Sequence, residues 1–144
     1  MRIEIRRLDS ELQLPSAQHP GDAGYDLHAR EDAKLEAGGG QALVPTGVAV
    51  AVPPGCAGFV QPRSGLALRH GVTCLNTPGL IDPGYRDELK VLLINTDPNE
   101  AYTVHRGDRI AQLVIQRVEQ VDWAEVVDLG DSERDVRGFG STGR

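Results

Sequence analysis

The chain has 144 residues and a net charge of −6, with 40% hydrophobic, 25% charged and 4% aromatic residues. This length fits one domain whose core is large enough to fold without disulfides or structural metals. The acidic balance argues against a nucleic-acid-binding face, which would be basic, and no apolar run approaches the ~20 residues that span a membrane. With so few aromatic residues, the core should be built from Val, Leu, Ile and Ala.

The N-terminal end carries no apolar stretch of the kind found in secretory signals, so we expect a cytoplasmic protein. The two cysteines, Cys56 and Cys74, stand among apolar residues and outside any CxxC pattern. We expect both to be reduced and partly buried.

Short β-branched runs, separated by 17 Gly and 9 Pro, predict an all-β chain. We expect strands at residues 3–7, 42–52, 58–61, 72–76, 88–95, 102–104, 110–118 and 123–127. One short helix is expected at 65–70, opened by Ser64. Many short strands with frequent turns are typical of a jelly roll, sandwich or barrel. Val and Ala alternate over 48–52, so both faces of that strand should be buried, at a subunit interface or against a second sheet.

Residues 129–144 are rich in Gly and charged residues and hold few apolar ones. Such a segment cannot bury enough surface to offset its ordering entropy. It is either a frayed tail or a mobile arm that orders over a ligand. We therefore expect a β domain at 1–128 followed by this arm.

Two early segments hold charged groups beside glycines. DAGYDL (22–27) places Asp22 and Asp26 around a glycine, which alone is typical of a turn followed by a strand. PRSGLAL (62–68) supplies Arg63, the Ser64 hydroxyl and the Gly65 backbone, which are the parts of an anion site. The same residues also fit a helix cap beside a solvated arginine.

Residues 82–85, Asp-Pro-Gly-Tyr, predict a type II turn that brings Asp82 and Tyr85 together at a hairpin tip. Asn76 carries an amide suited to a base edge, although Asp82 could simply cap backbone N–H groups of the turn. Residues 106–109 form a further turn before a strand. Gln112 then interrupts an apolar run and needs a partner, which is either a ligand or neighbouring backbone.

The last segment, RGFGSTG (137–143), nearly matches a phosphate-binding P-loop. It lacks the lysine, the preceding strand and the following helix that such a loop requires. Its glycines, hydroxyls and arginines still suit phosphate, and Phe139 could stack on a base.

Together and in this order, the segments resemble the five motifs of the homotrimeric dUTPase family. The stretches that carry the resemblance are DAGYDL (22–27), PRSGLAL (62–68), NTPGLIDPGYRDELKV (76–91), RGDRIAQLVI (106–115) and RGFGSTG (137–143). The resemblance extends over nearly the whole chain. The resemblance implies an all-β jelly roll, a homotrimer with active sites between subunits, and a C-terminal arm that reaches over each site. The implied reaction is hydrolysis of dUTP to dUMP and pyrophosphate with Mg²⁺.

The resemblance also implies a role for individual residues. Asp82 would orient and deprotonate the attacking water, and Tyr85 would pack on the deoxyribose and exclude a 2′-OH. Asp26 would contact water molecules around the Mg²⁺. The phosphate chain would be held by Arg63, Ser64, Gly65 and Gln112.

Asn76 would read the uracil edge together with nearby hairpin backbone, and the substrate-binding set includes Gly79, Ile81 and Lys90. In the arm, Arg137, Ser141 and Thr142 would close on the β- and γ-phosphates, Phe139 would stack on uracil, and Gly140 belongs to the substrate-binding set. The sequence departs from the family at Asp87, where Gly is common.

Two other functions use the same scaffold. A dCTP deaminase, or a bifunctional deaminase–pyrophosphatase, would differ in its second motif after Arg63 and Ser64. A non-catalytic nucleotide-binding module would have no use for the water-activating carboxylate of Asp82.

Overall fold

The computed structural model describes residues 1–132 and consists of short antiparallel strands with one helix. Helix α1 spans Ser64–His70. The strands are β1 Glu4–Arg7, β2 Tyr25–His28, β3 Ala33–Leu35, β4 Gln41–Pro45, β5 Val48–Ala51, β6 Cys56–Gln61, β7 Val72–Cys74, β8 Gly79–Ile81, β9 Lys90–Asn95, β10 Tyr102–Val104 and β11 Arg109–Arg117.

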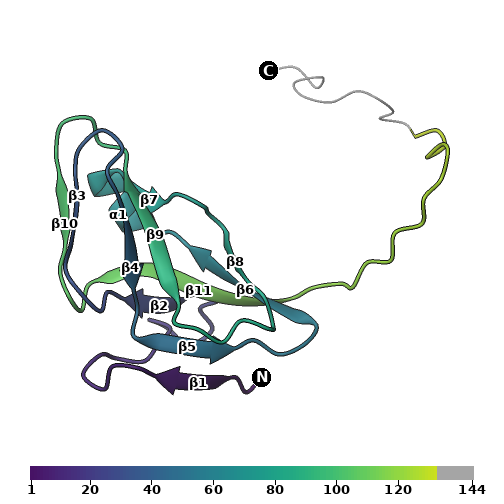
Figure 1. Ribbon diagram of the computed structural model, residues 1–144, viewed down its shortest axis with the longest axis horizontal. Coiled ribbons are helices and arrows are strands. Elements are labelled where there is room, and N and C mark those ends of the chain that lie inside the picture. The colour runs from purple at the N-terminus through teal and green to yellow at the C-terminus, as the bar shows by residue number, and fades with distance from the viewer. Residues whose placement is uncertain (133–144) are drawn as a thin grey trace.

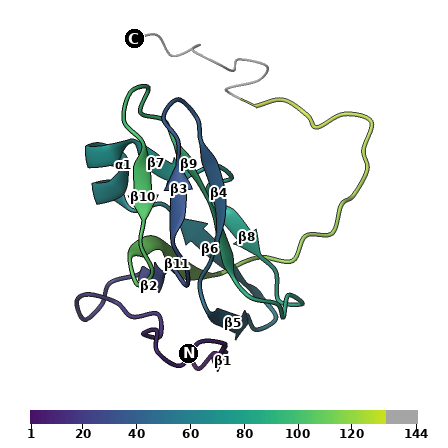
Figure 2. The same cartoon turned by 60° about the vertical axis from the view of Figure 1, so that its left-hand side comes forward.

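The strands form one four-stranded sheet, in the order β2-β11-β6-β8, and one three-stranded sheet, in the order β4-β9-β7. The pairs β1-β5 and β3-β10 complete the body. Strands β4 and β9 run across β6 and β11 in Figure 1, and α1 lies at one end beside β7 and β10 in Figures 1 and 2. The predicted all-β jelly roll is confirmed.

The core between the sheets is aliphatic, as the composition predicts. Its largest fully buried apolar side chains are Leu27, Leu35, Val44, Val52, Val72, Leu89, Val91, Leu93, Val104 and Ile110. Four polar or charged residues are buried as well, namely Asp26, His28, Thr46 and Asn95, and the last two bond to backbone carbonyls. The Asn95 amide donates to the carbonyls of Leu35 and Glu100, and the Thr46 hydroxyl donates to the carbonyl of Leu89. Cys56 and Cys74 are both free thiols, and burial raises the pKa of Cys74 to about 11.

The single strand expected at 42–52 is wrong, because the chain turns at Gly47. Gly47 has φ +73°, a left-handed conformation that favours glycine. Its N–H is occupied by the Glu88 carboxylate at 2.8 Å. The two halves, β4 and β5, therefore join different sheets. Val48, Ala49 and Val50 are all buried, which confirms that both faces of β5 are covered.

The strand expected at 123–127 is also wrong. This part of the chain leaves the body as an extended segment (Figure 1), and Trp123 is 91% exposed. Strands β3 and β8 were not among the expected strands, whereas β2 agrees with the interpretation of residues 22–27 as a turn followed by a strand. Strands β3 and β8 have three residues each, too few to show an alternating pattern, and β8 lies between two Pro-Gly turns.

A group of charged residues, the Arg106 cluster, joins three loops at one edge of the body. It comprises Asp9, Glu11, Arg30, Asp32 and Arg106. The Arg106 guanidinium donates to both oxygens of Asp9, at 2.6 and 3.0 Å, and to Glu11 at 3.1 Å. It also donates to the carbonyl of Arg30 at 2.7 Å, and its backbone N–H donates to Asp32 at 2.7 Å.

The Arg106 cluster should make stability sensitive to acid. The hydrogen bond from Arg106 lowers the pKa of Asp9 from 3.8 to about 2. As the pH falls below about 4, the unfolded chain takes up a proton that the folded chain refuses, so stability falls until the pH reaches the folded pKa. In urea unfolding at fixed protein concentration, Asp9→Asn should therefore lose less stability than the wild type between about pH 5 and about pH 3. Equal losses would contradict this role for Asp9.

Candidate active site

A buried carboxylate, Asp26 on β2, is the centre of the candidate site. It is 1% exposed and receives side chains from three directions. Arg109 lies 3.3 Å from Oδ2, and Arg63 Nε lies 3.6 Å from Oδ1. The amides of Gln18 and Gln112 donate to it at 2.9 and 3.3 Å. We call these five residues the Asp26 cluster.

The sheet brings the cluster together from distant parts of the sequence. Gln112 on β11 pairs with Asp26 on one side and with Gln61, the last residue of β6, on the other. Arg63 follows two residues later and also donates to the carbonyl of Arg109 at 3.0 Å. A Cβ at Gly24 would lie 3.1 Å from Gln112 Cδ, so this glycine makes room for the amide.

The partner that Gln112 needs is the Asp26 carboxylate, which is neither of the two partners expected. The structure also adds Gln18 and Arg109, to which the sequence reasoning assigned no role. Arg109 lies inside the quoted RGDRIAQLVI stretch, so its charge beside Gln112 was a usable signal. Gln18 lies in a polar loop that offers no pattern.

His28 lies beside the cluster on β2 and carries an unusual buried atom. Its Nδ1 has no hydrogen-bond partner within residues 1–132. Burial lowers the pKa of His28, Asp26 opposes that effect, and Arg109 and Arg63 add to it. Burial and the two guanidinium groups therefore favour the neutral form of the imidazole.

Arg63, Ser64 and Gly65 lie together where β6 gives way to α1. Arg63 is the N-cap residue, and within residues 1–132 no side chain caps the helix. Helix α1 begins at Ser64, one residue before the expected range, so Ser64 lies inside the helix and does not cap it. The alternative of a helix cap beside a solvated arginine is therefore wrong, since Arg63 is also only 25% exposed and faces Asp26.

Residues 76–85, which we call the Asp82 segment, present Asn76, Asp82 and Tyr85 on the surface. The expected hairpin is wrong, because β8 pairs with β6 whereas the next strand, β9, pairs with β4 and β7 in the other sheet. The Tyr85 N–H donates to the Asp82 carbonyl at 3.1 Å, which confirms a turn. The turn is not type II, however, because that type needs a positive φ at its third residue and Gly84 is outside the positive-φ glycines. The Tyr85 hydroxyl donates to the Glu88 carbonyl at 2.9 Å. Asp87, which stands where Gly is common in the family, accepts from the neighbouring Glu88 N–H at 2.7 Å. This contact is local to the loop after Tyr85.

Asp82 does not lie with the Asp26 cluster in one chain. β2 and β8 are the outer strands of the four-stranded sheet, and Ile81 pairs with Gly58 while Asp26 aligns with Gln61 through Gln112. Three spacings of about 4.8 Å across the sheet and about four residues of about 3.3 Å along it separate the two carboxylates by roughly 19 Å.

The remaining predicted residues fall elsewhere. Gly79 and Ile81 form the two ends of β8, and a Cβ at Gly79 would lie 3.3 Å from Asn76 Nδ2. Lys90 begins β9 in the other sheet, opposite Pro45. The arm residues Arg137, Phe139, Gly140, Ser141 and Thr142 lie outside the described residues.

Within residues 1–132, no group of three or more His, Cys, Asp or Glu side chains could hold a metal ion. Asp26 contributes one carboxylate, and both of its oxygens face donors from the chain. Mg²⁺ prefers oxygen ligands and keeps several waters. These residues fit a Mg²⁺ ion only if substrate oxygens and water supply most of its ligands.

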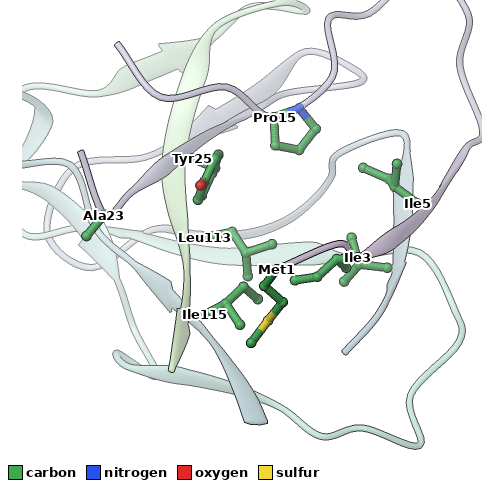
Figure 3. A pocket seen from close by; sticks show the side chains of 9 residues that line it. Met1, Ile3, Ile5, Pro15, Ala23, Tyr25, Leu113 and Ile115 are labelled. Carbon is green, nitrogen blue, oxygen red and sulfur yellow. The ribbon is translucent and has the colours of Figure 1, made fainter. Parts of the chain in front are cut away.

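An apolar trough of about 480 Å³ lies between the N-terminal strand and the four-stranded sheet. The side chains of Met1, Tyr25, Leu113 and Ile115 converge on it in Figure 3. Its lining, as far as the described chain forms it, holds no charged side chain. It is therefore unsuited to a phosphate, unlike the Asp26 cluster.

The chain matches a family model described as dUTPase over residues 10–143. The chain belongs to the dUTPase family. It is 59% identical over 143 residues to the deoxyuridine 5'-triphosphate nucleotidohydrolase of Thermobifida fusca, covering 99% of this chain and 79% of that protein.

The fold of this dUTPase-family chain is similar to two solved structures of phage dUTPases that were described with a ligand or a metal ion. A Staphylococcus bacteriophage 80alpha dUTPase variant with dUpNHpp has a TM-score of 0.87 and 28% identity, covering 99% of each chain. A dUTPase variant from phage phi11 of S. aureus, described with a structural Mg(II) ion, has a TM-score of 0.79 and 25% identity, covering 90% of this chain and 99% of that one. Among residues 1–132 of this dUTPase-family chain, no helix is long and apolar enough to cross a membrane.

Proposed function

We propose that the chain hydrolyses dUTP to dUMP and pyrophosphate and is thus a dUTP diphosphatase. Two guanidinium groups held against one buried carboxylate, in a chain of the dUTPase family, carry this proposal. The triphosphate brings about four negative charges, which repel an incoming nucleophile unless cations neutralise them. Arg63 and Arg109 supply fixed positive charge for that purpose.

The reaction is an in-line attack by water on the α-phosphorus. A new P–O bond forms from the water oxygen, and the bond from the α-phosphorus to the bridging oxygen breaks, so pyrophosphate leaves. Asp82 orients the water and accepts its proton. Ser64, Gly65 and Gln112 hold the phosphate chain with Arg63, and Asp26 orients the two guanidinium groups and Gln112.

In this proposal, specificity for the base and the sugar comes from the Asp82 segment. Asn76 and the backbone around Gly79 and Ile81 read the uracil edge, and Lys90 belongs to the same substrate-binding set. Tyr85 packs on the deoxyribose, where a 2′-OH would clash. A hydrogen-bonding mismatch in such a site is worth about 10⁴–10⁵-fold in discrimination, which would exclude cytosine.

Mg²⁺ binds with the substrate in this proposal, and Asp26 contacts it through water. When bound, the ion adds positive charge on the phosphate oxygens and so favours departure of pyrophosphate. The lack of a cage of three acidic or histidine ligands in residues 1–132 supports an ion held mainly by substrate and water.

The working form is a homotrimer in the cytoplasm, with each site shared between chains. The roughly 19 Å between Asp26 and Asp82 supports sharing, because a water molecule on a phosphate beside Arg63 is beyond the reach of Asp82 in that chain. The apolar trough and the exposed Val121, Trp123 and Val127 supply surface for association.

Residues 129–144 act as the arm that closes over the site. A chain that ends at residue 136 lacks Arg137, Phe139, Gly140, Ser141 and Thr142. It should lose at least about tenfold in kcat, because the β- and γ-phosphates lose charge-assisted contacts. Its melting temperature should stay within a few degrees of the wild type. A truncated protein that melts early would show a structural role instead.

Pyrophosphate release tests the function itself. With Mg²⁺ present, dUTP should be hydrolysed at least about 10³-fold faster than dCTP, as expected for a site that rejects mismatched hydrogen-bonding groups. It should also be hydrolysed faster than dTTP, whose 5-methyl group needs extra space in the base pocket, and faster than UTP, whose 2′-OH would clash with Tyr85. Ammonia release from dCTP would instead indicate a deaminase. Binding of dUTP without any release would indicate a nucleotide-binding module.

A further inference from the structure

The turn at residues 105–108 is anchored on both sides and ends where the Asp26 cluster begins. The His105 N–H donates to the Asp108 carboxylate at 2.8 Å, and the Asp108 N–H returns to the His105 carbonyl at 2.9 Å. Two main-chain hydrogen bonds of 2.8 Å tie Gly107 and Asp108 to Ala29 on the β2 side. These bonds fix the shape of the turn and join it to the β2 side of the sheet. The side of the turn that faces the N-terminal loop is held by other contacts.

Arg106 supplies these other contacts. Its guanidinium grips Asp9 with a two-pronged pair of hydrogen bonds and also reaches Glu11 and the Arg30 carbonyl. Paired contacts of this kind fix direction as well as distance. The same residue thereby connects the N-terminal loop and the β2–β3 turn to residues 105–108.

Arg109 follows the turn as the first residue of β11. It pairs with His28, and the pairing of β11 with β2 then shifts register between Arg109 and Ala111. Irregularities of this kind loosen the ladder locally and re-aim side chains. Arg109 makes two cluster contacts, since its guanidinium lies 3.3 Å from Asp26 and its carbonyl accepts from Arg63 at 3.0 Å. The turn on one side and the pair with His28 therefore set the position of Arg109 together.

We infer that Arg106 is a positioning residue for dUTP hydrolysis, acting through the 105–108 turn to hold Arg109, and through Arg109 to hold Arg63 against Asp26. This inference rests on the proposed function. Within residues 1–132, the contacts of Arg106 go to the Arg106 cluster and none goes to the Asp26 cluster. Misplacement of a binding group by about 1 Å can cost about 10²-fold in rate, so a remote clamp can matter for turnover.

Arg106→Gln tests the inference by steady-state kinetics with dUTP and Mg²⁺. We expect kcat to fall at least about tenfold while KM stays within about threefold. The substitution disturbs the alignment of the phosphate-binding groups but leaves the Asp82 segment, which reads uracil in the proposed function, unchanged. Arg106→Lys keeps the positive charge but not the paired hydrogen bonds to Asp9. The kcat of this variant should therefore lie between those of the wild type and Arg106→Gln. Arg106→Lys also serves if Arg106→Gln fails to fold.

Asp97→Ala is the matched control. Asp97 also anchors an exposed turn, where its carboxylate accepts from the N–H groups of Asn99 and Glu100 at 2.9 Å, and it lies outside both clusters. We expect a lower melting temperature from this variant and an unchanged kcat. If both Arg106 variants behave like Asp97→Ala, Arg106 is only structural and the inference fails.

A double-mutant cycle shows whether Arg106 acts through its neighbour. In an Arg109→Gln background, Arg106→Gln should lose most of its effect on kcat, because coupled residues are non-additive. Fully additive effects would overturn the inference while leaving the function intact. A wild-type protein that releases no pyrophosphate from dUTP would overturn both.

Discussion

Asp82→Asn is expected to lower kcat for dUTP by about 10²–10⁴-fold, the usual contribution of a general base. The substitution keeps the size of the side chain and the backbone of the 82–85 turn, in which the Tyr85 N–H donates to the Asp82 carbonyl. It removes only the group that would accept a proton from water. Affinity for dUpNHpp, a dUTP analogue, should stay within about threefold, because uniform binding is unaffected.

The loop that joins β8 to β9 offers a control for this change. Asp87→Asn makes an identical chemical change five residues along, at a carboxylate that accepts from the neighbouring Glu88 N–H. We expect that variant to keep wild-type kcat. If Asp82→Asn remains fully active, or if Asp87→Asn is equally impaired, the assignment of the base to Asp82 is wrong.

Asp26→Asn should affect both stability and turnover. The carboxylate is the common partner of Arg63, Arg109, Gln18 and Gln112. In the Asp26→Asn variant the negative charge between the two guanidinium groups is gone, and one of the two acceptor oxygens is replaced by an amide donor that faces other donors. The two guanidinium groups are 25% and 41% exposed and can still reach water, so we expect a loss of about 1–3 kcal/mol in the free energy of unfolding.

Turnover by Asp26→Asn should fall at least about tenfold even well below the melting temperature, because the phosphate-binding groups lose their alignment. Asp22→Asn is the control, since Asp22 lies in the loop just before β2 and, within residues 1–132, its carboxylate accepts only from the His19 N–H at 2.9 Å. Thermal unfolding and pyrophosphate release measured on both variants separate the two effects. An Asp26→Asn protein with wild-type kcat would show that the Asp26 cluster is not the phosphate site.

The all-β fold could be predicted from the sequence because alternating apolar residues are a local property of each strand. The same reasoning joined residues 42–52 into one strand, since nothing in the alternation of Val and Ala marks the change of sheet at Gly47. That change depends on the Glu88 carboxylate, which is 41 residues away. Apolar residues at 123–127 likewise gave a strand pattern without a neighbouring strand in the described chain to pair with.

The candidate site shows the same limit. Asp26, Arg63 and Gln112 could be selected because each lies in a segment whose residue types suit an anion or a carboxylate. Their convergence depends on the order β2-β11-β6 in one sheet, which is not a local property. Gln18 has no such signal, and the contribution of Arg109 follows from a register shift that no sequence period reveals.

The separation of Asp26 from Asp82 makes one experiment decisive for a site shared between chains. Arg63→Ala and Asp82→Asn, each nearly inactive alone, should be produced together in equal amounts with different tags and purified as mixed oligomers. Suppose that one chain supplies the Asp26 cluster and another chain supplies the Asp82 segment. Random mixing then restores about a quarter of the wild-type sites, because each of the two parts of a site comes from an intact copy half of the time. Activity no greater than that of the two variants alone would contradict the shared site and require both groups to act within one chain.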